Sequence, residues 1–550
     1  MNFFIRTGRL FFALAALMSV ISLSAQAQSW PQWMANSSHT GTPGVGGQRL
    51  TRILADIVYD PTVPSERAWG NGSLLAHYQV PLIDGERVFM EFKDGFAVGY
   101  TFGFLKWGEK AYEWRAGKLV ETWAFQSNWV PPGSLNDFWE PVFHAAVANG
   151  GVYVPMASGG IAKLDKNTGV VLQQIAPFGQ DFNAYQTGPL TVDKSGNIYY
   201  NVIQIVDGDS FYSNDATDSF LVKVTPMGMA TMVSYKALTA TAVAENTASE
   251  CLNYPCGIQR VGLNVGPAIG PDGTIYGVTR AHRIGSYAFL VAIKPNLTKK
   301  WVSTLRNRFH DGCGVPVASG GLPDGLLFGC SISSPLGVDP STNRPGDGQV
   351  DDSSSSSPAV GPDGAIFYGA QSFYNNFQGH MMKFNANGKY AGAYGFGWDQ
   401  TPAIFQRDDD NKKCNGNATC YSVVIKENHY PGVVPEAYYI TQLDQNLKVQ
   451  WQFKSTNTQS CSRNPDGTQS CVSDHPNGFE WCVNGHLVDA NGVVYANSED
   501  GNLYAIGQGG ILKEKIFQQL ALGAAYTPAS MDRKGRIYSL NAGHMFVVGH

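Results

Sequence analysis

The chain has 550 residues and a formal net charge of −5 at neutral pH, and 15% of its residues are charged while 12% are aromatic. It contains 62 glycines and 29 prolines, a composition typical of many short strands joined by tight turns. The small net charge, and the lack of any cluster of lysine and arginine with interleaved aromatic residues, argue against nucleic acid as a partner.

The N-terminal residues have the features of a secretory signal peptide. Arg6 and Arg9 form a short basic segment, an apolar run extends from Leu10 to about Leu23, and the small-residue site Ala25-Gln26-Ala27 follows. We expect a signal peptide over residues 1–27 and a mature chain over residues 28–550; a retained anchor is the alternative. No later run is apolar over the roughly 20 residues that a membrane helix needs, so we expect a periplasmic or secreted protein that does not span the membrane.

A turn followed by a short β run recurs along the mature chain. Asp-Gly or Asn-Gly supplies the positive φ of a tight hairpin turn, and a β-branched residue followed by an aromatic residue then starts a strand. The copies with this signature cover residues 83–89, 149–153, 193–199, 270–276, 361–367, 489–495 and 532–538.

A proline followed by a small or aliphatic residue precedes most of these turns. Proline suits the first residue of a strand, because that residue need not donate to the ladder. The marks are Pro81-Leu82, Pro141-Val142, Pro189-Leu190, Pro267-Ala268, Pro358-Ala359, Pro402-Ala403 and Pro528-Ala529, with Gly485-His486 in place of the proline before residue 489. Together they predict eight units, of which residues 402–453 form a divergent one that lacks the turn signature.

The repeated unit predicts an all-β fold. Each unit offers about four short strands, and such units repeated around a ring form a β-propeller. We therefore predict one propeller of about eight four-stranded blades. A pair of β-sandwiches is the alternative, but it does not explain eight copies of one pattern.

The nine cysteines predict local disulfides. Their spacing suggests the pairs Cys251 with Cys256, Cys313 with Cys330, Cys414 with Cys420 and Cys461 with Cys471, leaving Cys482, which could exchange with its neighbours. Zinc binding is the alternative, but the spacing lacks the CxxC and histidine pattern of zinc fingers.

The units resemble the pyrroloquinoline-quinone-like repeats of quinoprotein alcohol dehydrogenases and of the propeller lipoprotein of the outer-membrane assembly machine. The segment Trp30-Pro31-Gln32-Trp33, followed by His39-Thr40-Gly41, is similar to the start of these propellers. The resemblance implies that an N-terminal strand closes the ring against the last blade. It leaves function open, since the same architecture serves dehydrogenases and scaffolds.

The sequence departs from the quinone-dependent enzymes of that family. These usually carry two adjacent cysteines over the cofactor, and no two cysteines are adjacent here. Of the family's docking pattern, the chain keeps Asp165 and Thr168-Gly169 but has Lys163, Val170 and Gln173 at other positions of it, and it has no CxxCH for a covalent haem. We therefore predict no cofactor and disfavour pyrroloquinoline quinone with calcium.

The loops that lead into the innermost strands should converge on one face of a propeller. Aromatic rings with interleaved carboxylates and amides suit a sugar-like ligand, and Glu140, Asp399 and Glu480 are candidates for general acid and base. The alternative is that the tryptophans pack between blades and the carboxylates cap turns. The candidate ligand-binding residues in these loops are Trp139, Tyr185, Gln186, Asn264, Trp398, Gln400, Trp481 and Tyr526.

No metal site is predicted, because the histidines lack HxH or HExxH spacing and the acidic runs at 347–352 and 408–411 lack the pattern of a calcium loop. These acidic runs are expected to be solvated turns. The serine run 353–357 is expected to be a flexible loop between blades. We predict an exported binding or scaffolding propeller for a protein or a glycan. The alternative is an enzyme, either a divergent quinoprotein oxidoreductase or a polysaccharide-acting propeller.

Overall fold

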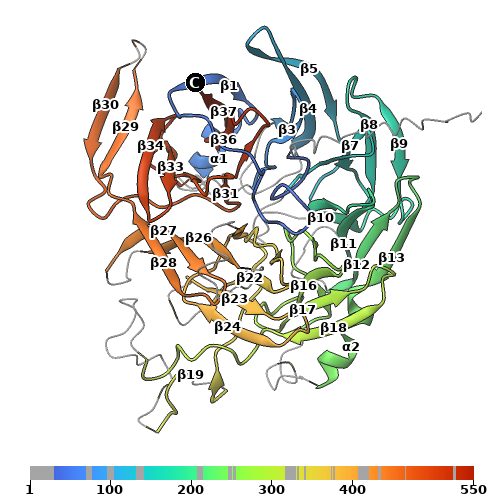
Figure 1. Cartoon of the computed structure of the whole chain (residues 1–550). Helices are drawn as coiled ribbons and strands as arrows, with labels where there is room; N and C mark the ends of the chain where they lie inside the picture. Colours follow the sequence, from blue (N-terminus) through green and yellow to red (C-terminus); the bar gives the residue numbers. More distant parts are fainter. Residues whose placement is uncertain are drawn as a thin grey trace, which may run out of the picture.

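The protein is a β-propeller with eight four-stranded blades, as the repeat predicts (Figure 1). The structure is a computed structural model that describes residues 30–69, 77–95, 104–131, 142–206, 215–245, 251, 256–315, 330, 333–339, 342–372, 375, 378–406, 420–430, 435–464, 466, 468–523 and 528–550. The predicted signal peptide and Trp139, Glu140, Cys414 and Tyr526 lie outside these residues.

We number the blades 1 to 8 in chain order and give the strands of each from the axis outward. Blade 1 contains β2 (Leu82–Asp84), β3 (Arg87–Gly95), β4 (Leu105–Arg115) and β5 (Lys118–Gln126), and blade 2 contains β6 (Ala146–Ala148), β7 (Gly151–Pro155), β8 (Ile161–Asp165) and β9 (Val171–Ile175). Blade 3 contains β10 (Ala184–Val192), β11 (Ile198–Ile205), β12 (Ala216–Val224) and β13 (Ala230–Ser234). Blade 4 has an interrupted inner strand of β14 (Gln259–Val261) and β15 (Ala268–Ile269), followed by β16 (Ile275–Ala281), β17 (Ala288–Ile293) and β18 (Lys299–Thr304).

Blades 5 to 8 continue the ring in the same order. Blade 5 contains β21 (Ala359–Val360), β22 (Ile366–Ala370), β23 (His380–Phe384) and β24 (Tyr390–Tyr394), and blade 6 contains β25 (Ala403–Gln406), β26 (Tyr421–His429), β27 (Ala437–Asp444) and β28 (Val449–Lys454). Blade 7 contains β31 (Leu487–Val488), β32 (Val494–Asn497), β33 (Asn502–Gly507) and β34 (Ile511–Phe517). Blade 8 contains β35 (Ala529–Met531), β36 (Ile537–Asn541), β37 (His544–Gly549) and β1 (Arg52–Val58).

An N-terminal strand closes the ring, as expected. β1 pairs antiparallel with the C-terminal strand β37 and is the outermost strand of blade 8. Blade 8 is therefore built from the C-terminal strands β35, β36 and β37 together with β1, which comes from the N-terminal part of the chain.

The predicted hairpin turns connect the two inner strands of their blades. The glycines of these turns have φ between 68° and 81°, in the region that other residues rarely adopt. They are Gly85, Gly150, Gly196, Gly273, Gly364, Gly492 and Gly535.

Each complete turn signature also has an aspartate that organises it. The Asp489 carboxylate accepts hydrogen bonds from the backbone N–H groups of Asn491 and Val493, each at 2.8 Å. The Tyr495 hydroxyl then donates to the same carboxylate at 3.5 Å. Asp532 and Tyr538 repeat this arrangement in blade 8, so the spacing of aspartate and tyrosine in the sequence reflects one local structure.

Residues 30–48, which we call the N-terminal strap, visit all eight blades in order. The strap lies on the face of the ring that carries the hairpin turns, which we call the turn face. Its hydrogen bonds join Trp30 to Ile83, Pro31 to Val147, Gln32 to Val192, Ser37 to Ile269, Ser38 to Val360, Thr40 to Ile404, Gly41 to Val488, and Gln48 to Gly535.

His39 joins the strap to blades 3 and 5. Its Nδ1 donates to the Pro358 carbonyl at 2.8 Å, and its Nε2 accepts from the Thr191 hydroxyl at 3.3 Å. Burial lowers the pKa of His39 to about 4, so the imidazole is neutral at pH 7. The strap is therefore held to the blades by a buried side chain as well as by its backbone.

A few elements lie outside the blades. They are α1 (Val63–Trp69), α2 (Tyr235–Glu245), the hairpin β19 (Val338–Asp339) and β20 (Arg344–Pro345), and the hairpin β29 (Gln459–Arg463) and β30 (Gln469–Ser473). Neither of the two helices among the described residues is long and apolar enough to cross a membrane.

Disulfides join Cys251 to Cys256, Cys313 to Cys330, and Cys461 to Cys471, three of the four pairs expected from the sequence. The last of these connects directly opposite residues of β29 and β30. Disulfides of this kind persist in an oxidising compartment.

Candidate functional site

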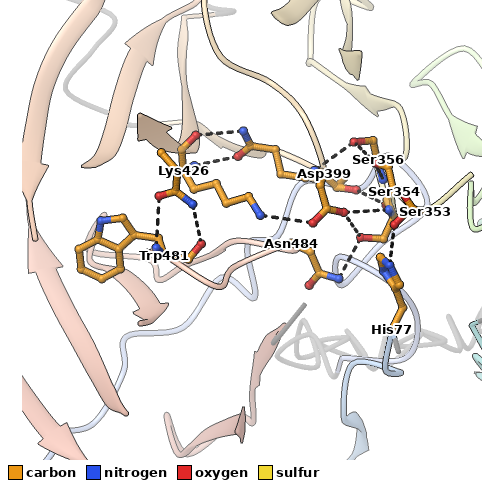
Figure 2. Close-up of polar contacts among 12 residues, drawn as sticks. His77, Ser353, Ser354, Ser356, Asp399, Lys426, Trp481 and Asn484 are labelled. Atoms are coloured by element: carbon orange, nitrogen blue, oxygen red, sulfur yellow. Dashed lines mark hydrogen bonds and ion pairs between the residues drawn. The ribbon is translucent and has the colours of Figure 1, made fainter. Parts of the chain in front are cut away.

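The candidate residues lie on the face opposite the turn face, where the outer strand of one blade leads into the inner strand of the next. We call it the loop face. Asp399 and Gln400 precede β25 of blade 6, and Glu480 and Trp481 precede β31 of blade 7. These segments come together near the axis in a network of polar side chains (Figure 2).

Asp399 is at the centre of this network. It is 2% exposed, and its φ of 54° turns the chain sharply before β25. Its Oδ1 accepts a hydrogen bond from the backbone N–H of Ser355 at 3.0 Å, and its Oδ2 forms an ion pair with Lys426 Nζ at 3.4 Å (Figure 2). Lys426 comes from β26 and is 4% exposed, so both charges of the pair are buried.

Gln400 fixes the strand that carries this lysine. Its Oε1 accepts from the Lys426 N–H at 2.7 Å, and its Nε2 donates to the Lys426 carbonyl at 3.0 Å. His486 lies beside the pair, and its Nε2 donates to the Gln400 Oε1 at 2.9 Å. Burial lowers the pKa of His486 to about 3, so this side of Lys426 carries no competing positive charge at neutral pH.

The serine run is not the loop that the sequence suggests. Ser354 to Ser357 are 4% exposed or less, and each is held by hydrogen bonds. The Ser356 hydroxyl accepts from the Gln400 N–H at 3.0 Å, the Ser357 N–H donates to the Thr401 hydroxyl at 3.0 Å, and the Asn484 side chain donates to the Ser355 hydroxyl at 3.0 Å. The run therefore forms a buried wall between blades 5, 6 and 7.

A buried ion cluster lies next to this wall, because Asp352 directly precedes the serine run. Arg260 donates to both carboxylate oxygens of Asp352, at 2.9 and 2.5 Å, and Arg280 reaches the same carboxylate at 2.9 Å. Arg260 is 0% exposed and Asp352 is 1% exposed. The acidic run that ends at Asp352 is thus a structural ion cluster rather than the solvated turn expected from the sequence.

His77 connects opposite blades across the axis. It precedes β2 of blade 1, and its Nε2 donates to the Ser353 carbonyl at 2.8 Å, although Ser353 precedes blade 5 (Figure 2). Blades 1 and 5 are four positions apart in a ring of eight. This contact therefore joins segments from opposite sides of the ring on the loop face.

Glu480 borders the network with a carboxyl group that holds its proton. Burial raises the pKa of Glu480 to about 8, and the nearby Glu499 carboxyl adds to the rise. The pKa of Glu499 is raised as well, mainly by burial. At pH 7 Glu480 is therefore a hydrogen-bond donor without charge, and it is half-buried.

The two described candidate tryptophans have different surroundings. Trp398 is half-buried and makes an edge contact with Tyr430, with ring centroids 6.3 Å apart. Trp481 is 0% exposed and packs against Phe453 and Tyr504, with centroids 5.9 and 5.1 Å apart. Trp398 thus has surface to offer a ligand, whereas Trp481 packs between blades.

The remaining candidates lie on blades 3 and 4. The Gln186 side chain donates to the Gly188 carbonyl at 2.5 Å and Tyr185 lies beside it on β10. Asn264 has a φ of 60° and donates to the Asp352 carbonyl at 3.3 Å, which links it to the serine wall. Asp399, Gln400 and Asn264 are thus connected through the network.

Sequence reasoning did not select Lys426, Asn484, His77, Glu499 or the serine wall. Asn484 and the serines directly precede the strand marks at Gly485-His486 and Pro358, so the rule that selected Asp399 applies to them too. Lys426 carries no such signal, because an isolated lysine within a strand is usually on the surface.

The described part of the chain contains no group of three or more histidine, cysteine or acidic side chains placed to hold a metal ion. Two carboxylates of this region are already occupied, since Asp352 binds two arginines and Asp399 binds Lys426. The described residues of the site therefore do not fit a quinone held with calcium.

No protein-family model and no curated protein matches the sequence. Among solved structures, the quinohemoprotein alcohol dehydrogenase from Comamonas testosteroni matches with a TM-score of 0.55 and 12% identity over 96% of this chain and 82% of that chain. A europium-containing methanol dehydrogenase has a TM-score of 0.49 and 11% identity over 94% and 89% of the two chains, and BamB from Moraxella catarrhalis has 0.38 and 10% over 91% and 99%. Together with the eight blades, the first of these matches shows that the chain has the fold of the pyrroloquinoline-quinone-like propellers, as its turn and strand marks predict.

Proposed function

We propose that this chain is an exported binding or scaffolding propeller that recognises an uncharged, hydroxyl-rich ligand such as a glycan at its loop face. The observation that carries the proposal is the charge balance of the site. Asp399 and Lys426 neutralise each other, and Glu480 keeps its proton at pH 7. The site therefore offers hydrogen-bonding groups and an aromatic ring without net charge.

Two polar atoms support a ligand at this face. Asn484 is 1% exposed, and its Oδ1 has no hydrogen-bond partner among the described residues. The Trp398 Nε1 is buried and also lacks a partner in the described part of the chain. Buried polar atoms normally have partners, so an acceptor and a donor left open in one neighbourhood favour a binding role.

Glycan binding can be tested on a glycan array with the purified mature protein. We expect the wild type to retain at least one neutral glycan and Trp398→Ala to weaken that binding at least about fivefold, because an aromatic contact contributes about 1 kcal/mol beyond the area it buries. Glu121→Ala, on the outer strand of blade 1, is the control and should bind as the wild type does. An array on which no glycan is retained, or binding that Trp398→Ala does not change, contradicts the proposal.

The pH dependence of that binding gives a second prediction. Below pH 8 the Glu480 carboxyl is protonated and can donate a hydrogen bond, and above pH 8 it becomes a carboxylate and loses the proton. Affinity should therefore fall as the pH rises through 8 in the wild type. In Glu480→Gln the affinity should be nearly constant over the same range, as measured by titration calorimetry from pH 6 to 9.5; an equal fall in both proteins would remove Glu480 from the site.

The enzymatic alternative has a direct test. Purified protein incubated with pyrroloquinoline quinone and calcium should bind no chromophore and should not reduce a dye in the presence of alcohols or sugars. A bound chromophore with dye reduction would replace the binding proposal by an oxidoreductase.

A further inference from the structure

The turn face contains a cavity of about 380 Å³, separate from the loop-face site. It lies between the N-terminal strap and the ends of the inner strands of blades 4 to 7. Its lining residues from the strap are Ser38, Thr40, Thr42 and Gly44, and the blades contribute Pro271, Val360, Gly361, Pro362, Ile404, Phe405, Gln406, Asp489 and Ala490. A volume of this size is sufficient for a small organic ligand.

The described residues that line the cavity present no available charge. Asp489 is its one ionisable lining residue and is 2% exposed. Its carboxylate already accepts hydrogen bonds from the N–H groups of Gly47, Asn491 and Val493 at 2.9, 2.8 and 2.8 Å. A charged ligand would lose its hydration here without gaining an opposite charge, so the cavity favours an uncharged one.

The strap gives the cavity one hydroxyl donor. The Asn36 Oδ1 accepts from the N–H groups of Ser38 and Thr40, which fixes the orientation of the amide. The Asn36 Nδ2 therefore donates to the Thr40 hydroxyl at 2.6 Å, and the Thr40 and Thr42 hydroxyls are 2.8 Å apart. The Thr40 hydroxyl then donates to the Thr42 hydroxyl, and this series of hydrogen bonds leaves the Thr42 hydroxyl proton for a ligand.

Ser38 supplies the complementary acceptor. Its hydroxyl donates to the Ile269 carbonyl at 2.7 Å, so its lone pairs remain for an incoming donor. A hydroxyl group both accepts and donates, and it can therefore pair with Thr42 and Ser38. The apolar walls, which include Pro271, Pro362 and Phe405, suit the face of a ring.

We propose that this cavity is a second binding site, specific for an uncharged ring that carries a hydroxyl group. The ring can belong to a free small molecule or to a tyrosine side chain of a partner protein. The inference does not depend on the proposed function, because no residue of the cavity takes part in the loop-face network.

The test uses p-cresol and N-acetyltyrosinamide as probes of the mature full-length protein, with 4-hydroxybenzoate as the charged comparison, in ligand-observed NMR titrations. We expect p-cresol to bind and 4-hydroxybenzoate not to bind. If N-acetyltyrosinamide binds with an affinity similar to that of p-cresol, the site is assigned to a protein side chain. If p-cresol binds and N-acetyltyrosinamide does not, the site is assigned to free small molecules.

Two variants locate the binding. Thr42→Val keeps the shape of the side chain and should weaken p-cresol about fivefold, the effect of losing one neutral hydrogen bond. Ala490→Trp, at an exposed turn on the rim of the cavity, should abolish binding, and Lys194→Trp, at the matching turn position of blade 3, should not. The proposal is wrong if p-cresol does not bind below about 10 mM, a concentration that already corresponds to very weak affinity, or if Thr42→Val and Ala490→Trp leave its affinity unchanged. Loss of binding in Trp398→Ala instead would place the ring at the loop face, which overturns this inference and supports the proposed function.

Discussion

Replacing Glu109 by glutamine should stabilise the protein at neutral and alkaline pH. Glu109 lies on β4, is 0% exposed, and faces Glu91 at the opposite position of β3. Its Oε1 accepts a hydrogen bond from the Gln79 side chain at 2.8 Å. Burial raises the pKa of Glu109 to about 8, so the folded protein holds this proton at pH 7, whereas the unfolded chain releases it.

The sign of the effect follows from the pKa of Glu109 in the folded protein and its pKa in the unfolded chain. Between about pH 4.5 and pH 8 the folded state binds one more proton than the unfolded state at this residue, so the wild type loses about 1.4 kcal/mol of stability for each pH unit of increase. Glutamine has nearly the shape of the protonated side chain and does not titrate. The gain in the free energy of unfolding of Glu109→Gln over the wild type should therefore be small at pH 4.5 and reach several kcal/mol at pH 8.

Urea denaturation at pH 4.5, 6, 7 and 8 measures this difference directly. Glu121→Gln, which removes an exposed carboxylate from the neighbouring strand β5, is the matched control and should change stability by less than about 1 kcal/mol at each pH. A difference between Glu109→Gln and the wild type that does not vary with pH would show that the carboxyl group is ionised in the folded protein.

The repeat was predictable because its causes are local. Asp489, Gly492 and Tyr495 interact within one turn, so their spacing survives in the sequence of each blade that uses it. The closing strand was also expected, but only from the resemblance of the first residues to other propellers. The order in which the strap visits the blades could not be expected, since it depends on contacts between residues hundreds of positions apart.

The candidate site was likewise predictable only in part. The rule that residues before the inner strands converge identified Asp399, Gln400 and Glu480, because the fold itself places those positions. It could not identify Lys426, whose role depends on the packing of β26 against the loop that carries Asp399. A run of five serines resembles a flexible linker in composition, and only its partners on blades 6 and 7 make it a buried wall.

Replacing Arg260 by methionine should destabilise the protein by about 3 to 5 kcal/mol, because it leaves a buried carboxylate with one of its two cations removed. Arg260 and Asp352 are both buried, and the pair is bidentate. Arg280 remains at 2.9 Å, and the Leu263 N–H still donates to the Asp352 Oδ1 at 3.1 Å, but both bonds from Arg260 are lost. The measurement is the free energy of unfolding in urea at pH 7, with Arg52→Met on the exposed outer strand of blade 8 as the control.

A second variant separates the ion pair from the packing of the arginine. Asp352→Asn, alone and combined with Arg260→Met, completes a double-mutant cycle, in which the two losses should fall short of additivity by at least about 1 kcal/mol if Arg260 acts through its contact with Asp352. Asp352 immediately precedes the serine wall, so Arg260→Met should also weaken binding at the loop face while leaving the strap cavity unaffected. A loss below about 1 kcal/mol in Arg260→Met, or losses that simply add in the double variant, would mean that Arg260 contributes through packing rather than through its charge.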